Sequence, residues 1–186
     1  EEPRRYLLVF QNNSELRPSG GFIGSFALLD VDRGEITNLE IPGGGSYDIQ
    51  GQLTAKVASP KPLRLISPHW AFHDANWSPD FPTSAKRLSW FYEKSGGPTV
   101  DGVIAINASV MERLLTVVGP VAMEEYDVTL DAENFVDETQ REVEMDYDKE
   151  ENKPKQILSD MAPIVLERVM QADRENYIDL ARTLEE

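Results

Sequence analysis

Residues 100–123, VDGVIAINASVMERLLTVVGPVAM, set the fold class. The run VDGVIAI has the length of a core strand, and Asn107 can cap the helix that follows over residues 108–118. Gly119 and Pro120 end that helix before a short apolar strand at residues 121–123. The order strand, helix, strand predicts a layered α/β fold, which we expect to be a mixed β-sheet with helices packed on both faces.

Outward from this stretch, residues 6–41 predict the rest of the sheet. Residues 6–10, YLLVF, are a continuous apolar run, which is typical of a strand buried on both faces. Residues 22–32 and 35–41 are two strand-like runs around a turn, so we expect a hairpin. Residues 11–21, between the first strand and the hairpin, are polar and contain Gly and Pro, which predicts a loop.

The remaining segments predict helices and irregular connections. Residues 42–82 form a Gly- and Pro-rich connection with one helical turn at 62–66, and connections of that length are often functional. In chain order we also expect a helix at 82–94, a strand at 126–129, a helix from an Asp131 cap to about Glu142, an exposed acidic loop at 143–155 and helices at 156–172 and 173–186.

The composition limits the class of protein. The chain has 186 residues, which fits one domain over residues 1–186, and we expect it to be part of a longer protein that continues at both ends. The net charge of -15 repels nucleic-acid phosphates, so we expect no nucleic-acid partner. The absence of cysteine excludes disulfides and a cysteine nucleophile. No apolar run is long enough to span a bilayer.

Residues 12–17, NNSELR, hold the first candidate site. They follow a buried strand, and open α/β sheets bind ligands beyond the carboxyl ends of their strands. Arg17 offers a planar fork for phosphate or carboxylate, and Glu15 could orient it. The alternatives are a structural salt bridge, loop hydrogen bonds and a plain turn. The candidate ligand-binding residues here are Asn12, Asn13, Gly20 and Gly21.

Residues 69–80, HWAFHDANWSPD, hold the second candidate site. Asp74 and Asp80 supply hard oxygen ligands that suit Mg²⁺. Asn76 and Trp77 could contact a ligand beside them. The alternative is that the two Asp side chains cap turns and the helix beginning near residue 82, with Trp77 in the core.

Five stretches, in order along nearly the whole chain, resemble the bacterial domain family DUF4012. They are YLLVFQNNSELRPSGGFIGSF (6–26), DANWSPDFPTSA (74–85), VDGVIAIN (100–107), LLTVVGPV (114–121) and YDKEENKPKQIL (147–158). The resemblance implies a transmembrane anchor ahead of the domain. It therefore implies an extracytoplasmic, membrane-anchored location.

The order of parts is also similar to the LytR-CpsA-Psr phosphotransferases, which move glycopolymers from a polyprenyl-pyrophosphate carrier onto peptidoglycan with Mg²⁺ and several arginines. The shared parts are the buried strand with its polar loop, a strand ending in Ile41-Pro42, and a later helix ending in Gly-Pro-Val at 119–121. This similarity implies a LytR-CpsA-Psr-like fold. Those enzymes have Arg-Asp after the Ile-Pro, whereas this chain has Gly43-Gly44, so Arg17 would have to replace that arginine.

Two functions follow from these resemblances and residues. The first is an envelope domain that binds or transfers a polyprenyl-pyrophosphate-linked glycan or cell-wall polymer. In a Mg²⁺-dependent phosphotransferase of this kind, Arg17 would neutralise the pyrophosphate. Asp74 or Asp80 would hold the metal, and Glu15 would position Arg17 or act as a base.

The second function is a noncatalytic envelope module that binds glycan or a protein partner. An enzyme needs Arg17 and an acid that converge on a cleft, whereas a binding module would show exposed aromatic surface. The aromatic residues concerned are Trp70, Trp77 and Trp90.

Overall fold

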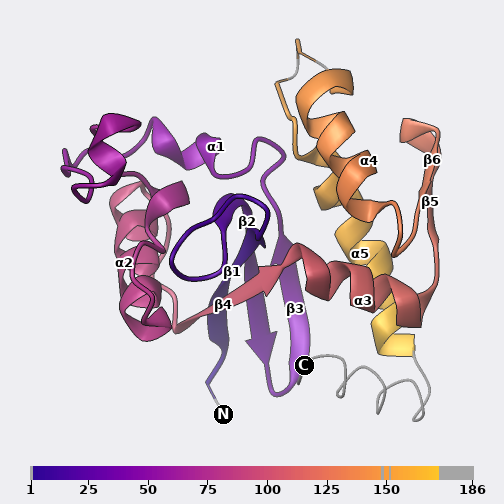
Figure 1. Ribbon diagram of the computed structural model, residues 1–186. Helices are drawn as coiled ribbons and strands as arrows, with labels where there is room; N and C mark the ends of the chain where they lie inside the picture. Colours follow the sequence, from indigo (N-terminus) through magenta and orange to yellow (C-terminus); the bar gives the residue numbers. More distant parts are fainter. Residues whose placement is uncertain (1, 148, 151, 172–186) are drawn as a thin grey trace. The chain divides into compact units, whose positions relative to one another are not determined.

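The computed structural model describes residues 2–147, 149–150 and 152–171 (Figure 1). The chain divides into two compact units, Glu1–Asn107 and Ala108–Glu186. The first unit contains a four-stranded sheet, and the second contains a two-stranded sheet and helices. The predicted mixed α/β class is confirmed. In the described residues, no helix combines the length and the apolar character needed to cross a membrane.

The four-stranded sheet of the first unit has the order β3-β2-β1-β4. Neighbouring strands run antiparallel, except that β1 and β4 run parallel. The predicted hairpin is confirmed, because β2 and β3 pair antiparallel. Arg33 and Gly34, between these strands, have left-handed φ values of 52° and 88°, which suits a two-residue turn. The strands are β1 (Arg4–Asn12), β2 (Phe22–Asp32), β3 (Glu35–Glu40) and β4 (Gly102–Asn107).

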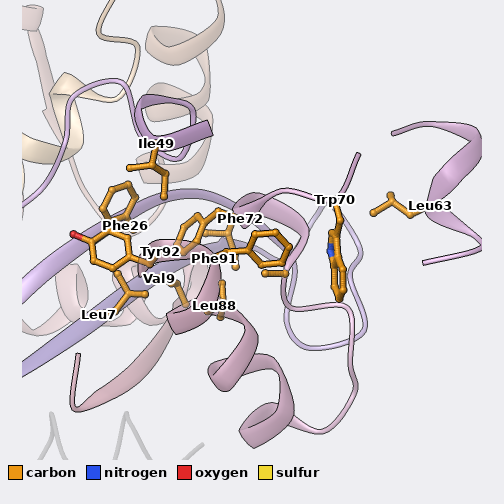
Figure 2. Close-up of a cluster of buried hydrophobic side chains, with 12 residues drawn as sticks. Leu7, Val9, Phe26, Ile49, Leu63, Trp70, Phe72, Leu88, Phe91 and Tyr92 are labelled. Carbon is orange, nitrogen blue, oxygen red and sulfur yellow. The ribbon is translucent and has the colours of Figure 1, made fainter. Parts of the chain in front are cut away.

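One face of this sheet carries the apolar core of the unit. Side chains alternate between the faces of a strand, so Leu7 and Val9 of β1 lie on the same face as their partners Leu28 and Phe26 of β2. Figure 2 shows Leu7, Val9 and Phe26 in one cluster with the aromatic side chains of Phe72, Phe91 and Tyr92. The helices that pack there are α1 (Tyr47–Gln50), α2 (Phe81–Lys94) and the short 3₁₀ turns η1 (Leu63–Leu65) and η2 (Phe72–Asp74).

The predicted long connection between the hairpin and α2 is held by buried aromatic residues. Phe72 in η2 is 1% exposed and packs edge-on against Phe26 of the sheet, with ring centroids 5.5 Å apart. The indole Nε1 of Trp70 donates a hydrogen bond of 2.8 Å to the backbone oxygen of Asp74. The connection therefore has little regular structure but contributes to the core.

The second unit surrounds its own apolar core. That core joins residues of every principal element, among them Leu115, Val121, Leu130, Phe135 and Met161. Arg168 Nη1 donates to the backbone oxygen of Pro120 at 2.6 Å, just after the end of the first helix. The elements are α3 (Ala108–Val118), β5 (Val121–Met123), η3 (Glu124–Tyr126), β6 (Val128–Leu130), α4 (Phe135–Arg141), η4 (Glu142–Asp146) and α5 (Gln156–Gln171).

The structure corrects three sequence-based boundaries in this unit. The strand predicted from residue 126 begins at Val128, because Asp127 has a left-handed φ of 50° that ends a 3₁₀ turn. Asp131 accepts hydrogen bonds from the backbone of Glu133 and Asn134, and the helix starts at Phe135. The predicted acidic loop begins as the π-helical turn η4. The helix predicted at 173–186 lies outside the described residues.

Truncation of Phe72 should destabilise the first unit strongly. The Phe72→Ala variant removes a fully buried ring that contacts the sheet, and such truncations cost about 3–5 kcal/mol. Denaturant unfolding followed by circular dichroism measures this free energy. Leu65→Ala is the control, because Leu65 is 94% exposed and its loss should change stability by less than about 0.5 kcal/mol. Equal stability of the two variants would contradict this core.

Candidate functional site

The two predicted sites meet in one ion pair. Arg17 Nε donates to Asp74 Oδ1 at 2.6 Å, which joins residues 57 positions apart. The Arg17 side chain is 19% exposed and that of Asp74 is 5% exposed, so water screens the pair weakly. His73 Nε2 lies 3.4 Å from the other carboxylate oxygen, Asp74 Oδ2. The structural salt bridge considered for Arg17 is present.

Aromatic rings lie beside this ion pair. The Arg17 guanidinium lies 5.2 Å from the centroid of the Phe22 ring, and the His73 ring lies 5.4 Å from Phe22 and 5.7 Å from Tyr47. Burial tends to raise the pKa of Asp74, but the hydrogen bonds and charges of His73 and Arg17 outweigh it, and the pKa is lowered. Asp74 is therefore ionised at neutral pH, and it neutralises Arg17.

One ring nitrogen of His73, Nδ1, is buried without a hydrogen-bond partner among the described residues. Because Nε2 faces Asp74, a carboxylate orients the imidazole, and this arrangement is the one that prepares a histidine for proton transfer.

Asn76 and the glycine pair hold the two loops together. The amide nitrogen Nδ2 of Asn76 donates to the backbone oxygens of Gly21 at 2.6 Å and Ser19 at 3.2 Å. Gly21 has φ +143°, and a Cβ there would lie 2.1 Å from the oxygen of Asn12. Gly20 also has a positive φ of 101°. These residues therefore serve the shape of the loop.

The other predicted site residues have local partners. Asn12 Nδ2 donates to Glu15 Oε1 at 3.1 Å in an exposed turn, and Asn13 is exposed beside it. Asp80 Oδ2 accepts the backbone N–H of Thr83 at 2.9 Å, which confirms the capping role considered for Asp80. No hydrogen bond or ion pair within the described chain links Glu15 or Asp80 to Arg17.

The arrangement does not fit the expected Mg²⁺ site. One oxygen of Asp74 is bonded to Arg17, the other faces His73, and Asp80 caps a helix. A cation needs several oxygen ligands that converge on one point. Trp77 is half-buried against the core cluster and Trp70 is buried, so both rings serve packing, whereas Trp90 is 39% exposed.

A pocket of about 430 Å³, which was not among the predicted sites, lies on the core face of the sheet. The register pairs Arg5 of β1 with Asp30 of β2, and Asp30 with Asn38 of β3. Paired residues share a face, so a polar row continues the apolar rows of the core. The lining residues are Arg5, Phe26, Leu28, Asp30, Asn38, Glu40, Pro42, Ile49, Gln52, Tyr92, Ser95, Gly96, Gly97 and Pro98.

The pocket combines a buried apolar floor with a polar rim. Phe26, Ile49 and Tyr92 are 2%, 8% and 4% exposed, and Figure 2 shows the Tyr92 hydroxyl at the outer edge of this cluster. The polar rim consists of the exposed side chains of Asn38, Glu40 and Gln52. A Cβ at Gly97 would lie 2.5 Å from the Tyr92 ring, so the chain after α2 closes against this tyrosine only through glycine.

The charges of the pocket are unequally paired. Arg5 binds Asp30 with two hydrogen bonds, Nε to Oδ1 at 2.6 Å and Nη2 to Oδ2 at 3.0 Å. The hydrogen bond to Arg5 is the main reason why the pKa of Asp30 is lowered. The pKa of Tyr92 is raised, first by burial and then by the charge of Glu40. No hydrogen bond or ion pair engages the Glu40 carboxylate within the part of the chain that the structure describes.

A signal for this pocket was present in the sequence. Arg5 stands two residues before Leu7, and Asp30 stands two residues after Leu28, so both charges occupy the face that the apolar residues assign to the core. Glu40 and Tyr92 carried no such signal, because only the strand register and the packing of α2 bring them to the pocket.

The model of a family described as "Protein of unknown function (DUF4012)" matches residues 1–143, which is more than half of the chain. No curated protein matches the chain.

Loss of Arg17 should destabilise the fold. Arg17→Ala leaves Asp74 buried and without its main cation, and removal of one partner of such a pair costs about 3 kcal/mol. Asp74→Ala in the Arg17→Ala background should cost less than it does alone. Denaturant unfolding of the two single variants and the double variant measures this coupling.

Arg4→Ala is the control for this pair. Arg4 binds Asp101 at 2.9 Å, but its side chain is 58% exposed, so its loss should cost less than about 1 kcal/mol. If Arg17→Ala were as stable as Arg4→Ala, the pair would not hold the two loops together.

Proposed function

This chain belongs to the DUF4012 family, and we propose from that premise that it is a noncatalytic module of the bacterial cell envelope that binds a glycan. The observation that carries the proposal is the pocket on the sheet of the first unit. Its volume of about 430 Å³ lies in the range of roughly 300–1,000 Å³ that is usual for small-ligand sites.

The lining suits a saccharide. Sugar hydroxyls both donate and accept hydrogen bonds, and the rim offers amides at Asn38 and Gln52 and a carboxylate at Glu40. The buried rings of Phe26 and Tyr92 offer apolar surface to the C–H faces of a sugar ring. Since Arg5 is neutralised by Asp30, the pocket has no free positive charge to attract a phosphate.

The proposed location rests on the resemblance to DUF4012. We place the module outside the cytoplasmic membrane, attached through an anchor that is not part of this sequence. A LytR-CpsA-Psr-like layering, with helices on both faces of the sheet, is part of the same proposal. The acidic net charge of -15 suits a soluble surface that does not adhere to anionic lipids or nucleic acid.

The partners of Arg17 favour a binding module over a transferase. A transferase would need this guanidinium to meet a pyrophosphate, yet its Nε is bonded to Asp74 at 2.6 Å. Glu15 and Asp80 have local partners in a turn and a helix cap. The charges that transfer chemistry would use are therefore committed to holding loops.

Removal of the Tyr92 hydroxyl should weaken glycan binding. Tyr92→Phe keeps the ring in the core and removes one hydrogen-bonding group from the pocket, which should lower affinity about 3- to 10-fold. Isothermal titration calorimetry with the trimer of N-acetylglucosamine measures this change. Tyr47→Phe is the matched control, because Tyr47 is 57% exposed and does not line the pocket. The absence of trimer binding to the wild type would reject this saccharide, and a wider panel of neutral oligosaccharides would then decide the proposal.

A second candidate function is the transfer of a polyprenyl-pyrophosphate-linked glycopolymer. It is favoured by one observation, the imidazole of His73, whose Nε2 faces Asp74 and whose buried Nδ1 has no hydrogen-bond partner among the described residues. The similarity to the LytR-CpsA-Psr enzymes points the same way.

The second candidate predicts a ligand-induced rise in melting temperature. A short polyprenyl pyrophosphate at about 100 times its dissociation constant should stabilise the wild type by roughly 2.7 kcal/mol, which is a shift of several degrees. Thermal unfolding with and without Mg²⁺ measures it. A cooperative melt that the ligand leaves unchanged would exclude this candidate.

A further inference from the structure

The pocket in the first unit has a charge that its own residues do not balance. Three charged side chains line it, namely Arg5, Asp30 and Glu40. Arg5 and Asp30 neutralise each other through two short hydrogen bonds. The negative charge of Glu40 is therefore the net charge of the lining.

Glu40 is placed to act on a ligand. It ends β3 and pairs with Leu28 of β2, so it shares a face with the core and stands one row from the polar row of Arg5, Asp30 and Asn38. Its charge reaches across the pocket, since it contributes to the raised pKa of Tyr92. Arg5 is the sole Lys or Arg among the described residues of the lining, and Asp30 already binds it.

We propose that Glu40 makes this pocket selective for saccharides that carry a free, protonated amino group. The inference rests on the proposed glycan-binding function and names the ligand class of the same site. The amides, the tyrosine hydroxyl and the apolar floor bind the neutral part of the sugar, whereas the carboxylate of Glu40 receives the ammonium group. An acidic sugar meets like charge at the same point and is disfavoured.

The strength of charge-assisted hydrogen bonds sets the size of the expected preference for the amino sugar. A hydrogen bond in which the donor or the acceptor is ionised is roughly twice as strong as a neutral one, and an ammonium donor adds its own charge to that of the carboxylate. This difference corresponds to about tenfold in affinity between an amino sugar and its N-acetylated form. Because the rim is exposed, the preference should decrease as salt is added.

The test compares two trimers that differ at the amino group. Isothermal titration calorimetry at about pH 6, where such amines are protonated, measures the glucosamine trimer and the N-acetylglucosamine trimer. The wild type should bind the glucosamine trimer about tenfold more tightly. Glu40→Gln should keep its affinity for the acetylated trimer and lose the preference. Glu35→Gln is the matched control on the same strand, and it should behave as the wild type does, because Glu35 does not line the pocket.

The outcomes distinguish this inference from the glycan-binding function on which it rests. If both trimers bound the wild type equally, the selectivity would be overturned while glycan binding stood. If neither trimer bound the wild type, the proposal that this pocket binds these sugars would be rejected, and the selectivity would be rejected with it. If Glu35→Gln lost the preference as fully as Glu40→Gln, the effect would come from the general acidic surface, and the role of Glu40 would be rejected. A folded Glu40→Gln variant that bound neither trimer would also reject selectivity as its role.

Discussion

The register between β1 and β2 is the constraint on which the first unit depends. Leu7 pairs with Leu28 and Val9 with Phe26, so one face of the sheet receives the aromatic core. The same alternation places Arg5 and Asp30 on that face, one pair further along the strands. A slip by one residue would exchange the two faces, exposing the core residues and burying polar ones, so core and pocket are fixed by the same hydrogen-bond ladder.

A second constraint organises the irregular part of this unit. The loop after β1 and the segment around η2 have few backbone ladder bonds of their own, and they hold each other through side chains. The pair of Arg17 and Asp74 joins them at one point, and the amide of Asn76 joins them at another. Because the ion pair is mostly buried, it defines one position for the Arg17 side chain. Residues that were selected as candidates for catalysis therefore also hold these two segments together.

The charged side chains that line the pocket differ from the Arg17–Asp74 pair, because one of them, Glu40, has no charged partner among the described residues. A polar row at the end of a buried face costs stability, because apolar residues there would extend the core. Arg5 and Asp30 reduce this cost by binding each other, and Asn38 lies beside them on β3. Glu40 has no such partner among the described residues, which leaves its exposed carboxylate open to a ligand. The glycine closure beside Tyr92 preserves the space that a side chain would fill.

The sequence by itself determined the order and type of most elements. Local patterns were enough for the hairpin, for α2 with its Asp80 cap and for the run from β4 through α3 to β5, because alternation, capping and Gly-Pro stops act over a few residues. They were also enough to select Arg17 and Asp74 as unusual residues. Only the tertiary structure decided that these two bind each other across 57 positions, and that Arg5, Asp30, Glu40 and Tyr92 meet around one cavity. The physical reason is that such contacts depend on strand register and on how a helix packs over a sheet, and neither is encoded in the spacing of neighbouring residues.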